Sequence, residues 1–490
     1  MTPFTVEPKV RCPEFPPEST WLNVSRPLSL AEDLRGCVVV LDFWTYCCIN
    51  CMHVLPVLAR IEERFRGRPL VVIGVHSAKF ISERDPENIR KAIGRHAVAH
   101  PVVVDSEHDI WEQFAVRAWP TLVLVDAEGY VRQTLPGEAR EADLAAAIDS
   151  LLEEGAGRGV LAPEPPDIAP DPEKDETFLR FPAKIHVQGD RLFIADSGHN
   201  RIVIAARDGR VQAIVGEGGA GAHDGEAAQA SFHNPQGMAA LDGTLFVADT
   251  GNHLIRAIDL ETLRVRTIAG TGRKGEGVAG RPGDDPRAIA MRSPWALLAL
   301  QRQLLIAMAG SHQIWVYDLD DNSIGPCAGS GREDHIDGPA REAALAQPSG
   351  LARSGRHVFI ADSEVSSIRA FDMQEGVVQT IVGHGLFDFG DQDGAPQNVL
   401  LQHPLDVAVD GNVLYVADSY NNKVKAIAFG SMETRTAFGD GRRATLHEPG
   451  GLAIDQGRVL IADTNNHRIL IGDPAKGSLE ELTLRAGTGF

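Results

Sequence analysis

The sequence predicts a multidomain chain, an α/β domain followed by an all-β domain made of six repeats. Three observations lead to this prediction. Strand-like apolar runs alternate with helical patterns up to residue 152, an acidic proline-rich segment follows at 153–176, and one sequence unit recurs from 177 to 490. A chain of 490 residues is also longer than a single hydrophobic core usually supports. We therefore place the domains at 1–152 and 177–490, with a linker at 153–176.

The first domain alternates buried strands with helices. Continuous apolar runs rich in valine and isoleucine predict fully buried strands, whereas apolar residues at helical spacing predict helices. In chain order we expect a strand at 38–44, a helix at 54–61, a strand at 70–75, a helix at 86–93, strands at 101–104 and 121–125, and a helix at 141–152. Strands separated by helices predict a largely parallel sheet that is covered on both faces.

Segment 153–176 has the composition of an extended spacer. It carries five prolines between Pro163 and Pro172, acidic residues along its length and almost no periodic apolar pattern. Proline-rich segments of this kind act as semi-rigid spacers. The domain boundary is therefore expected within this segment.

Three markers recur six times in the same order after the linker. The first is Ala-Asp-Ser/Thr followed by a polar turn, beginning at Ala195, Ala248, Ala361, Ala417 and Ala462, and in the third unit it returns as Ala307-Met308-Ala309. The second is a proline that opens a short apolar strand, at Pro182, Pro235, Pro294, Pro348, Pro404 and Pro449. The third is Gly-x-Gly, beginning at Gly216, Gly270, Gly329, Gly383, Gly439 and Gly487. Each unit has room for about four short strands but not for a core of its own, which predicts a β-propeller of six blades. No strand exchange that would close the ring is apparent.

Two cysteines lie where a buried strand runs into a helix. They belong to the run Cys48-Ile49-Asn50-Cys51, shortly after strand 38–44. This spacing puts Cys48 at the N-terminus of the helix and Cys51 one turn further on. Free backbone amides and the positive end of the helix dipole stabilise a thiolate there, so that Cys48 can attack a disulfide and Cys51 can resolve the mixed disulfide.

The surroundings of this dithiol resemble the thioredoxin-like pattern. An apolar strand with Asp42, the Cys-x-x-Cys and then Pro56 in the following helix occur in the expected order. The resemblance implies that Asp42 is a buried carboxylate that helps to move a proton off Cys51, and that Pro56 bends the helix. It also implies a cis-proline loop facing the dithiol, which Trp119-Pro120 would form. The catalytic candidates are therefore Cys48, Cys51, Asp42 and Pro120, with Trp44, Tyr46, Cys47, Asn50 and Trp119 as neighbours.

The two domains together resemble one family. The stretches Trp21-Leu22-Asn23, Phe43-Trp44-Thr45-Tyr46 and Cys48-Ile49-Asn50-Cys51, followed by repeats similar to NHL repeats, resemble the NHL-repeat-containing protein 2 family over nearly the whole chain. The resemblance implies a thioredoxin-like thiol-disulfide oxidoreductase whose six-bladed NHL-type propeller binds protein partners. It also implies that the repeat aspartates and the Asn/His positions hold the turns by side-chain hydrogen bonds. Longer members add a C-terminal β-rich domain, whose role is not carried over to this chain.

Two other functions of this domain stay open. A degenerate thioredoxin-like domain would act as a redox sensor or scaffold without turnover. Thr45 lies three residues before Cys48, as in peroxiredoxins, but Leu41 stands where those enzymes carry proline. A thiol peroxidase is therefore disfavoured.

The remaining cysteines are expected to have structural roles. Cys47 stands where thioredoxins carry tryptophan, and Asn50 where many carry proline. We expect Cys47 to be a buried thiol, although it could pair with Cys48 or Cys51. A zinc site made by these three cysteines and His53 is disfavoured, because adjacent cysteines converge poorly on one ion. The cysteines expected to pack inertly are Cys12, Cys37 and Cys327.

Charge and composition limit the partners. The net charge of -20 disfavours nucleic acid and anionic membranes, because both attract clustered Lys and Arg. The N-terminus lacks a basic stretch followed by an apolar run, and the longest apolar runs have strand length, so we expect a cytoplasmic protein without a membrane span. We expect no metal and no cofactor other than a redox-active Cys48–Cys51 disulfide. Asp388–Gly394 lacks the spacing of a calcium loop and is interpreted as a blade loop.

Overall fold

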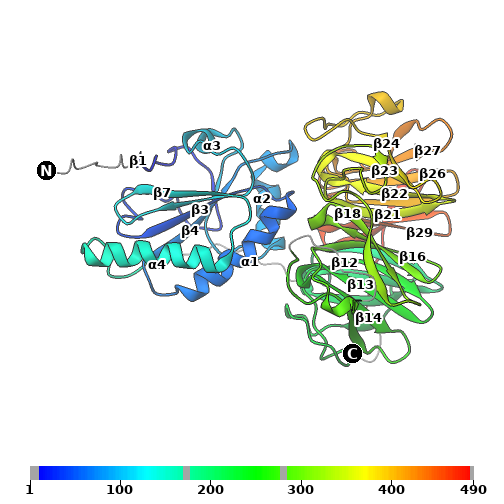
Figure 1. Cartoon of the computed structure of the whole chain (residues 1–490). Coiled ribbons are helices and arrows are strands. Elements are labelled where there is room, and N and C mark those ends of the chain that lie inside the picture. Colours follow the sequence, from blue (N-terminus) through cyan, green and yellow to red (C-terminus); the bar gives the residue numbers. More distant parts are fainter. Residues whose placement is uncertain (1–9, 169–176, 276–283, 486–490) are drawn as a thin grey trace. The chain divides into compact units, whose positions relative to one another are not determined.

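The computed structural model describes residues 10–168, 177–275 and 284–485 and divides the chain into two compact units, Met1–Lys174 and Asp175–Phe490. The first unit is an α/β fold, coloured blue to cyan in Figure 1, and the second is a β-propeller of six sheets, coloured green to red. The fold class predicted from the sequence is therefore confirmed.

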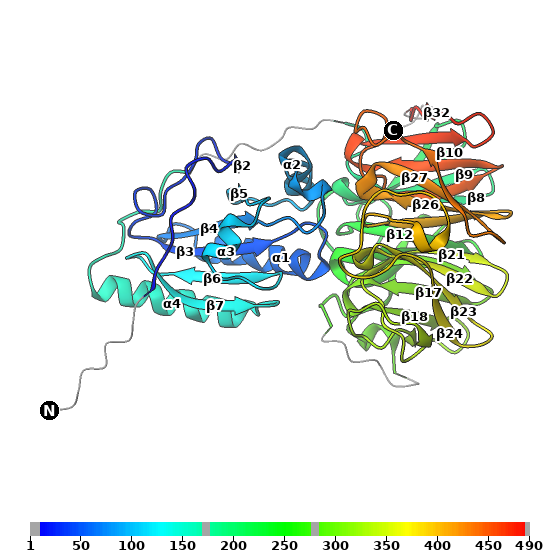
Figure 2. The same ribbon diagram turned by 90° about the horizontal axis from the view of Figure 1, so that it is seen from above.

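The first unit is built on a seven-stranded sheet in the order β1-β7-β6-β3-β4-β5-β2. Helices α1 and α4 pack side by side on one face, and α3 packs on the other (Figure 1; Figure 2). The elements in chain order are β1 Val10–Arg11, β2 Trp21–Leu22, β3 Val38–Trp44, α1 Ile49–Arg64, β4 Leu70–His76, η1 Ser82–Arg84, α2 Pro86–Arg95, β5 Val102–Val104, α3 Asp109–Gln113, β6 Thr121–Val125, β7 Tyr130–Pro136 and α4 Glu141–Gly157.

The expectation of a largely parallel sheet is wrong. Only β3, β4 and β5 run parallel, whereas β6, β7, β1 and β2 pair antiparallel with their neighbours. The hairpin that turns at Asp126–Gly129, with Gly129 at φ 82°, makes β7 antiparallel to β6. β7 was missed because it carries polar, half-exposed residues and gives no apolar run.

The start of the predicted linker belongs to the first unit. Helix α4 does not end at Leu152 but continues to Gly157, and the chain after it folds back onto the sheet. Ala162 N–H donates to the carbonyl of Gly36, and Leu161 packs where a side chain on Gly155 would lie. Gly155 leaves room for this return. Residues 169–176 lie outside the described residues.

The second unit consists of six antiparallel sheets, one for each sequence repeat. Their strands are β8 Pro182–Gln188, β9 Arg191–Asp196, β10 Arg201–Ala206 and β11 Val211–Val215; β12 Pro235–Leu241, β13 Thr244–Asp249, β14 Leu254–Asp259 and β15 Val265–Ala269; β16 Pro294–Leu300, β17 Gln303–Met308, β18 Gln313–Asp318 and β19 Ser323–Ala328; β20 Gly338–Pro339, β21 Pro348–Ser354, β22 His357–Asp362, β23 Ser367–Asp372 and β24 Val377–Val382; β25 Asp406–Asp410, β26 Val413–Asp418, β27 Lys423–Ala428 and β28 Thr434–Phe438; and β29 Gly451–Asp455, β30 Arg458–Asp463, β31 Arg468–Asp473 and β32 Ser478–Glu481.

The repeat motif links each blade to the next. In the first blade, Asp196 accepts a hydrogen bond from the backbone N–H of Arg180, and the hydroxyl of Ser197 donates to the carbonyl of Pro235 in the second blade. The same pair of bonds is made at Asp249 and Thr250, Asp362 and Ser363, Asp418 and Ser419, and Asp463 and Thr464. The third blade has Met308 and Ala309 at these positions, which cannot form either bond.

The ring closes without strand exchange. Thr464 of the last blade donates to the carbonyl of Pro182 in the first, as every other Ser or Thr of the motif does to its neighbour. The chain after β32 then pairs beside β11, where Arg485 donates to the carbonyl of Gly209 and accepts from Val211 N–H. The inter-blade loops also pair with the outer strands β15, β24 and β28, but antiparallel, whereas Arg485 and Arg210 pair parallel.

The Asp-Gly loops have a structural role. Arg256 and Arg369 are fully buried, and each joins a motif aspartate to a loop aspartate, Asp224 or Asp337. In the fifth blade, Lys425 contacts the two aspartates of the segment interpreted as a blade loop, Asp391 and Asp393. Among the described residues, no helix is long and apolar enough to cross a membrane.

Candidate active site

Strand β3 delivers the dithiol to the start of α1. Cys48 is the N-cap of the helix, in an extended conformation, and its carbonyl accepts the first helical hydrogen bond, from Met52. Cys51 lies one turn further along. Both cysteines are free thiols, with Cys48 7% and Cys51 1% exposed. The predicted placement of both residues at the helix N-terminus therefore agrees with the structure.

Cys51 is held as a protonated thiol in the reduced chain. Burial raises its pKa well above the usual range, and a side-chain hydrogen bond with Cys48 and the charge on Cys48 raise it further. The backbone of Thr45 opposes this shift, and Asp42 adds to it. Because only a thiolate attacks a disulfide, Cys51 must lose its proton to a base before it can react.

Asp42 is the carboxyl group beside Cys51. It is fully buried in β3, and burial raises its pKa to about 7, against a lowering effect of His100. Neither carboxylate oxygen has a hydrogen-bond partner within the part of the chain that the structure describes. A carboxyl group with this pKa can accept and release a proton near neutral pH.

The proline loop lies at the start of β6, next to β3. The Trp119–Pro120 peptide is cis, as predicted, and Pro120 is buried. Thr121 pairs with Phe43, which puts Pro120 beside the end of β3, where the cysteine loop begins. The indole of Trp119 donates to the carbonyl of Ser77 at 2.9 Å, which fixes the ring next to this loop.

The other predicted neighbours surround the dithiol in different ways. Trp44 is fully buried and meets His76 edge-on at 5.0 Å. Tyr46 stacks on the other side of His76 at 5.4 Å, with Arg95 over its own ring. Asn50 is half-buried in the first turn of α1. The rings of Trp44, Tyr46 and His76 thus pack together where β3 ends and the dithiol loop begins.

Sequence reasoning missed Glu83, which holds the dithiol loop. This fully buried residue lies in η1, where Oε1 accepts from Cys47 N–H and Oε2 from the backbone N–H groups of Lys79 and Phe80, all at 2.9 Å. A single glutamate in a loop gives no sequence signal. Cys47 itself is fully buried, with its sulfur 3.7 Å from the hydroxyl of Thr45.

The remaining cysteines lie in packed surroundings. Burial raises the pKa of Cys12 and of Cys327 to about 12, and Cys37 is also buried with a raised pKa. His53, considered above with a zinc site, pairs through Nδ1 with Glu138 at 2.7 Å. Among the described residues, no three His, Cys, Asp or Glu side chains gather to hold a metal ion.

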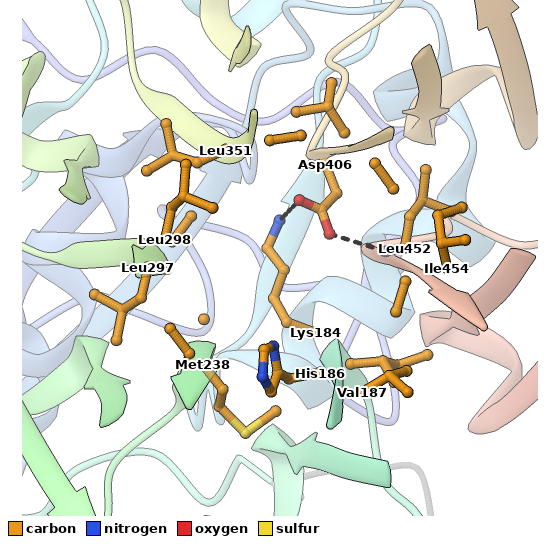
Figure 3. A pocket seen from close by; sticks show the side chains of 18 of the residues that line it. Lys184, His186, Val187, Met238, Leu297, Leu298, Leu351, Asp406, Leu452 and Ile454 are labelled. Atoms are coloured by element: carbon orange, nitrogen blue, oxygen red, sulfur yellow. Dashed lines mark hydrogen bonds and ion pairs between the residues drawn. The ribbon is translucent and has the colours of Figure 1, made fainter. Parts of the chain in front are cut away.

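The propeller contains a cavity of about 420 Å³ along its axis. The third residue counted from the motif proline lines the cavity in four of the six blades: Lys184, Gly237, Ala296 and Asp406. Figure 3 shows Lys184 and Asp406 pointing toward each other among aliphatic side chains, and their ion pair measures 2.9 Å. Burial lowers the pKa of Lys184 and raises that of Asp406, because desolvation outweighs their attraction. The ion pair is thus a satisfied structural contact across the channel.

Comparison with known proteins defines the class of this chain. Residues 36–131 match the thioredoxin-like family, and residues 232–258, 401–427 and 446–471 match the NHL repeat. The chain is therefore a thioredoxin-like domain followed by an NHL-repeat propeller. It is 39% identical to NHL repeat-containing protein 2 of Bos taurus, over 94% of this chain and 70% of that protein. The chain belongs to the NHL repeat-containing protein 2 family.

Two further relatives share different parts of the chain. Protein SUPPRESSOR OF QUENCHING 1, chloroplastic, of Arabidopsis thaliana is 40% identical over 96% of this chain but only 47% of its own length. Thiol-disulfide oxidoreductase YkuV of Bacillus subtilis is 25% identical over 29% of this chain and 94% of its own. The chain thus spans about half the length of the plant relative, whereas the bacterial one matches the first domain alone.

Proposed function

We propose that this chain is a thiol-disulfide oxidoreductase. The Cys48 thiolate attacks a substrate disulfide, forms a mixed disulfide and releases one substrate thiolate. Cys51 gives its proton to Asp42 and attacks the Cys48 sulfur, which forms the Cys48–Cys51 disulfide and releases the second substrate sulfur as a thiolate. The substrate gains the two electrons that the dithiol loses. No cofactor other than this disulfide is required.

The observation that carries the proposal is the pairing of Cys51 with Asp42. A buried thiol that is protonated at neutral pH lies beside a buried carboxyl group whose pKa is about 7. Placing a carboxyl group without hydrogen-bond partners in the protein interior is costly, so a purely structural role would favour an apolar residue. The pairing suits a proton transfer that accompanies the second step of disulfide exchange.

The test is disulfide reduction with dithiothreitol as electron donor and insulin as substrate. Wild type is expected to turn over, and Cys48→Ser to fall to the background rate. Cys51→Ser should stop after the first step and accumulate a mixed disulfide, visible by mass spectrometry. Cys327→Ser, in the propeller, is the matched control and should keep the wild-type rate. Equal rates for wild type and Cys48→Ser would refute the proposal.

A redox sensor without turnover is the second candidate. The low exposure of both thiols favours it, because a substrate must reach Cys48, which is only 7% exposed. A sensor would show a dithiol that titrates reversibly against glutathione but does not reduce insulin. The turnover assay separates the two functions.

The propeller is proposed to bring protein partners to the dithiol. The NHL repeats and the negative net charge of the chain support a protein partner over nucleic acid. The mixed disulfides captured by Cys51→Ser would identify such partners directly. A cytoplasmic location stays a prediction, since the Arabidopsis relative is named chloroplastic.

A further inference from the structure

A group of buried polar side chains lies between the sheet and α1, next to Asp42. Besides both oxygens of Asp42, the atoms Trp44 Nε1, His76 Nδ1 and Nε2, and His100 Nε2 are buried without a hydrogen-bond partner among the described residues. Buried polar atoms are nearly always hydrogen-bonded, so this many in one place needs an explanation. The group lies directly behind the dithiol.

Gly74 makes the space that these atoms share. It pairs with Asp42 in the register of β3 and β4, so the two residues lie side by side. A methyl group on Gly74 would lie 2.9 Å from Trp44 Nε1 and 3.5 Å from His100 Nε2. The absence of a side chain at Gly74 therefore opens a path from Asp42 toward the imidazole of His100.

His100 has one ring nitrogen facing inward and one facing outward. Nε2 faces the space above Gly74, and Nδ1 lies 3.4 Å from Oε2 of Glu62 on α1. The His100 side chain is 3% exposed and that of Glu62 is 30% exposed. Asn23 holds the backbone here by donating to the carbonyls of Val98 and His100. His100 therefore separates the buried carboxyl group from a carboxylate that reaches solvent.

The outer end of this path opens into a surface depression. It has a volume of about 240 Å³, and its lining includes Glu62, Arg66, Arg68 and His100. A proton that reaches Glu62 can pass to water there. His76 offers no such exit, because it lies between the rings of Trp44 and Tyr46 and burial lowers its pKa to about 3.

From this geometry we infer that His100 and Glu62 form the route by which the proton of Cys51 leaves the buried site. The inference rests on the proposed oxidoreductase function and extends it. Cys51 passes its proton to the Asp42 carboxylate as its sulfur attacks Cys48. Protonated Asp42 then gives the proton to Nε2 of His100, through water where the gap requires it, while Nδ1–H passes its proton to Glu62. Asp42 ends as the carboxylate with which it began, and the proton has left the interior.

The groups that face this route come from three elements and one loop. Asp42 lies on β3, Cys51 and Glu62 on α1, Gly74 on β4, and His100 just before β5. The charge of His100 already influences Asp42, since it lowers the pKa of that carboxyl against the effect of burial. His100 and Glu62 touch neither sulfur atom, so they are positioning residues for proton transfer rather than catalytic residues.

The test separates the two chemical steps in a single turnover of the full chain. Mixing the reduced protein with the aromatic disulfide dithiobis(nitrobenzoate) releases one coloured thiolate in a bimolecular phase, when Cys48 attacks. A second is released in a unimolecular phase, when Cys51 resolves the mixed disulfide. His100→Gln and Glu62→Gln should each slow the second phase on the order of tenfold, with a larger solvent deuterium isotope effect, and leave the first phase unchanged. Gly74→Ala, which fills the path, should act in the same way.

Glu63→Gln is the matched control. Glu63 adjoins Glu62 on α1 but is exposed and pairs with Arg66, so both phases should keep their wild-type rates. Circular dichroism and thermal unfolding would check that each variant is folded. A second phase that is unchanged in both His100→Gln and Glu62→Gln overturns the proposed proton route through His100 and Glu62.

Failure of the proposed function gives a different result. A wild-type chain that shows no second phase would contradict the oxidoreductase proposal. The proton route is then tested on the reduced chain, by following the titration of the Asp42 carboxyl group with NMR. His100→Gln should raise the pKa of Asp42, whereas Glu63→Gln should leave it unchanged. An unchanged pKa of Asp42 in His100→Gln overturns the proton route.

Discussion

At the scale of single residues, the buried carboxyl group of Asp42 lowers the stability of the fold near neutral pH. Its pKa in the folded chain is about 7, against an ordinary value of 3.8. Between these two pH values the folded chain holds a proton that the unfolded chain releases. The favourable contribution of the protonated form is therefore complete below about pH 4 and is lost as the pH rises through 7. A site under selection for stability alone would not carry this residue.

Asp42→Asn should remove this pH dependence. The variant carries a neutral side chain of similar size. The difference between its unfolding free energy and that of wild type should therefore become more favourable to the variant as the pH rises from 4 to 8. With about 1.4 kcal/mol for each pH unit between the two pKa values, the gain is at most roughly 4 kcal/mol. Calorimetry of the first domain's transition at both pH values would measure it. A relative stability that is the same at pH 4 and pH 8 would contradict the assignment of a raised pKa to Asp42.

At the scale of elements, η1 and the dithiol loop form one unit through Glu83. Its carboxylate accepts hydrogen bonds from the backbone of both segments, although they are far apart in sequence. Hydrogen bonds to a buried charged group are stronger than those between neutral groups. The conformation of Cys47, and with it the direction in which the chain enters α1, thus depends on one distant side chain.

Glu83→Gln should loosen this loop. The amide keeps one oxygen acceptor but places an NH₂ group against backbone N–H donors, which should destabilise the first domain by about 2 kcal/mol. Cys47, now fully buried, should become reactive to iodoacetamide in the native protein. Mass spectrometry of the labelled peptides would measure this, with exposed Glu112→Gln as the control. The same labelling of Cys47 in both variants would argue against the anchoring role of Glu83.

The elements also show what the sequence could predict and why. Strands such as β3 and β6 were predicted because their apolar runs are uninterrupted. The blades were predicted because the motif recurs in the sequence. Its Asp and Ser/Thr make the same bonds in five of six units. β7 was missed because its side chains are mostly polar and exposed, so the strand gives no apolar run. Glu83 and His100 were missed because their roles depend on distant segments brought together only by the fold. A local sequence pattern predicts the local secondary structure, whereas these side chains contact segments that are distant in the sequence.

At the scale of the whole propeller, ring closure depends on contacts between the first and last blades. β29 approaches β8 so closely that a side chain on Gly451 would meet the carbonyl of Ala183 at 2.2 Å. Lys184 of the first blade pairs with Asp406 of the fifth, whose other oxygen accepts from Leu452 N–H of the sixth. One buried ion pair thus joins three blades around the axis (Figure 3).

Removing one partner of this ion pair should therefore open the ring more easily than removing both. Lys184→Met leaves the Asp406 charge buried and unpaired, which should cost about 3–5 kcal/mol of propeller stability. The double variant Lys184→Met/Asp406→Leu should recover much of that loss, but not all, because Leu452 N–H loses its acceptor. Calorimetry of the propeller transition would measure both, and hydrogen exchange of β29 and β8 would locate the opening. Additive losses in the double variant would show that Lys184 and Asp406 stabilise the ring independently rather than as a pair.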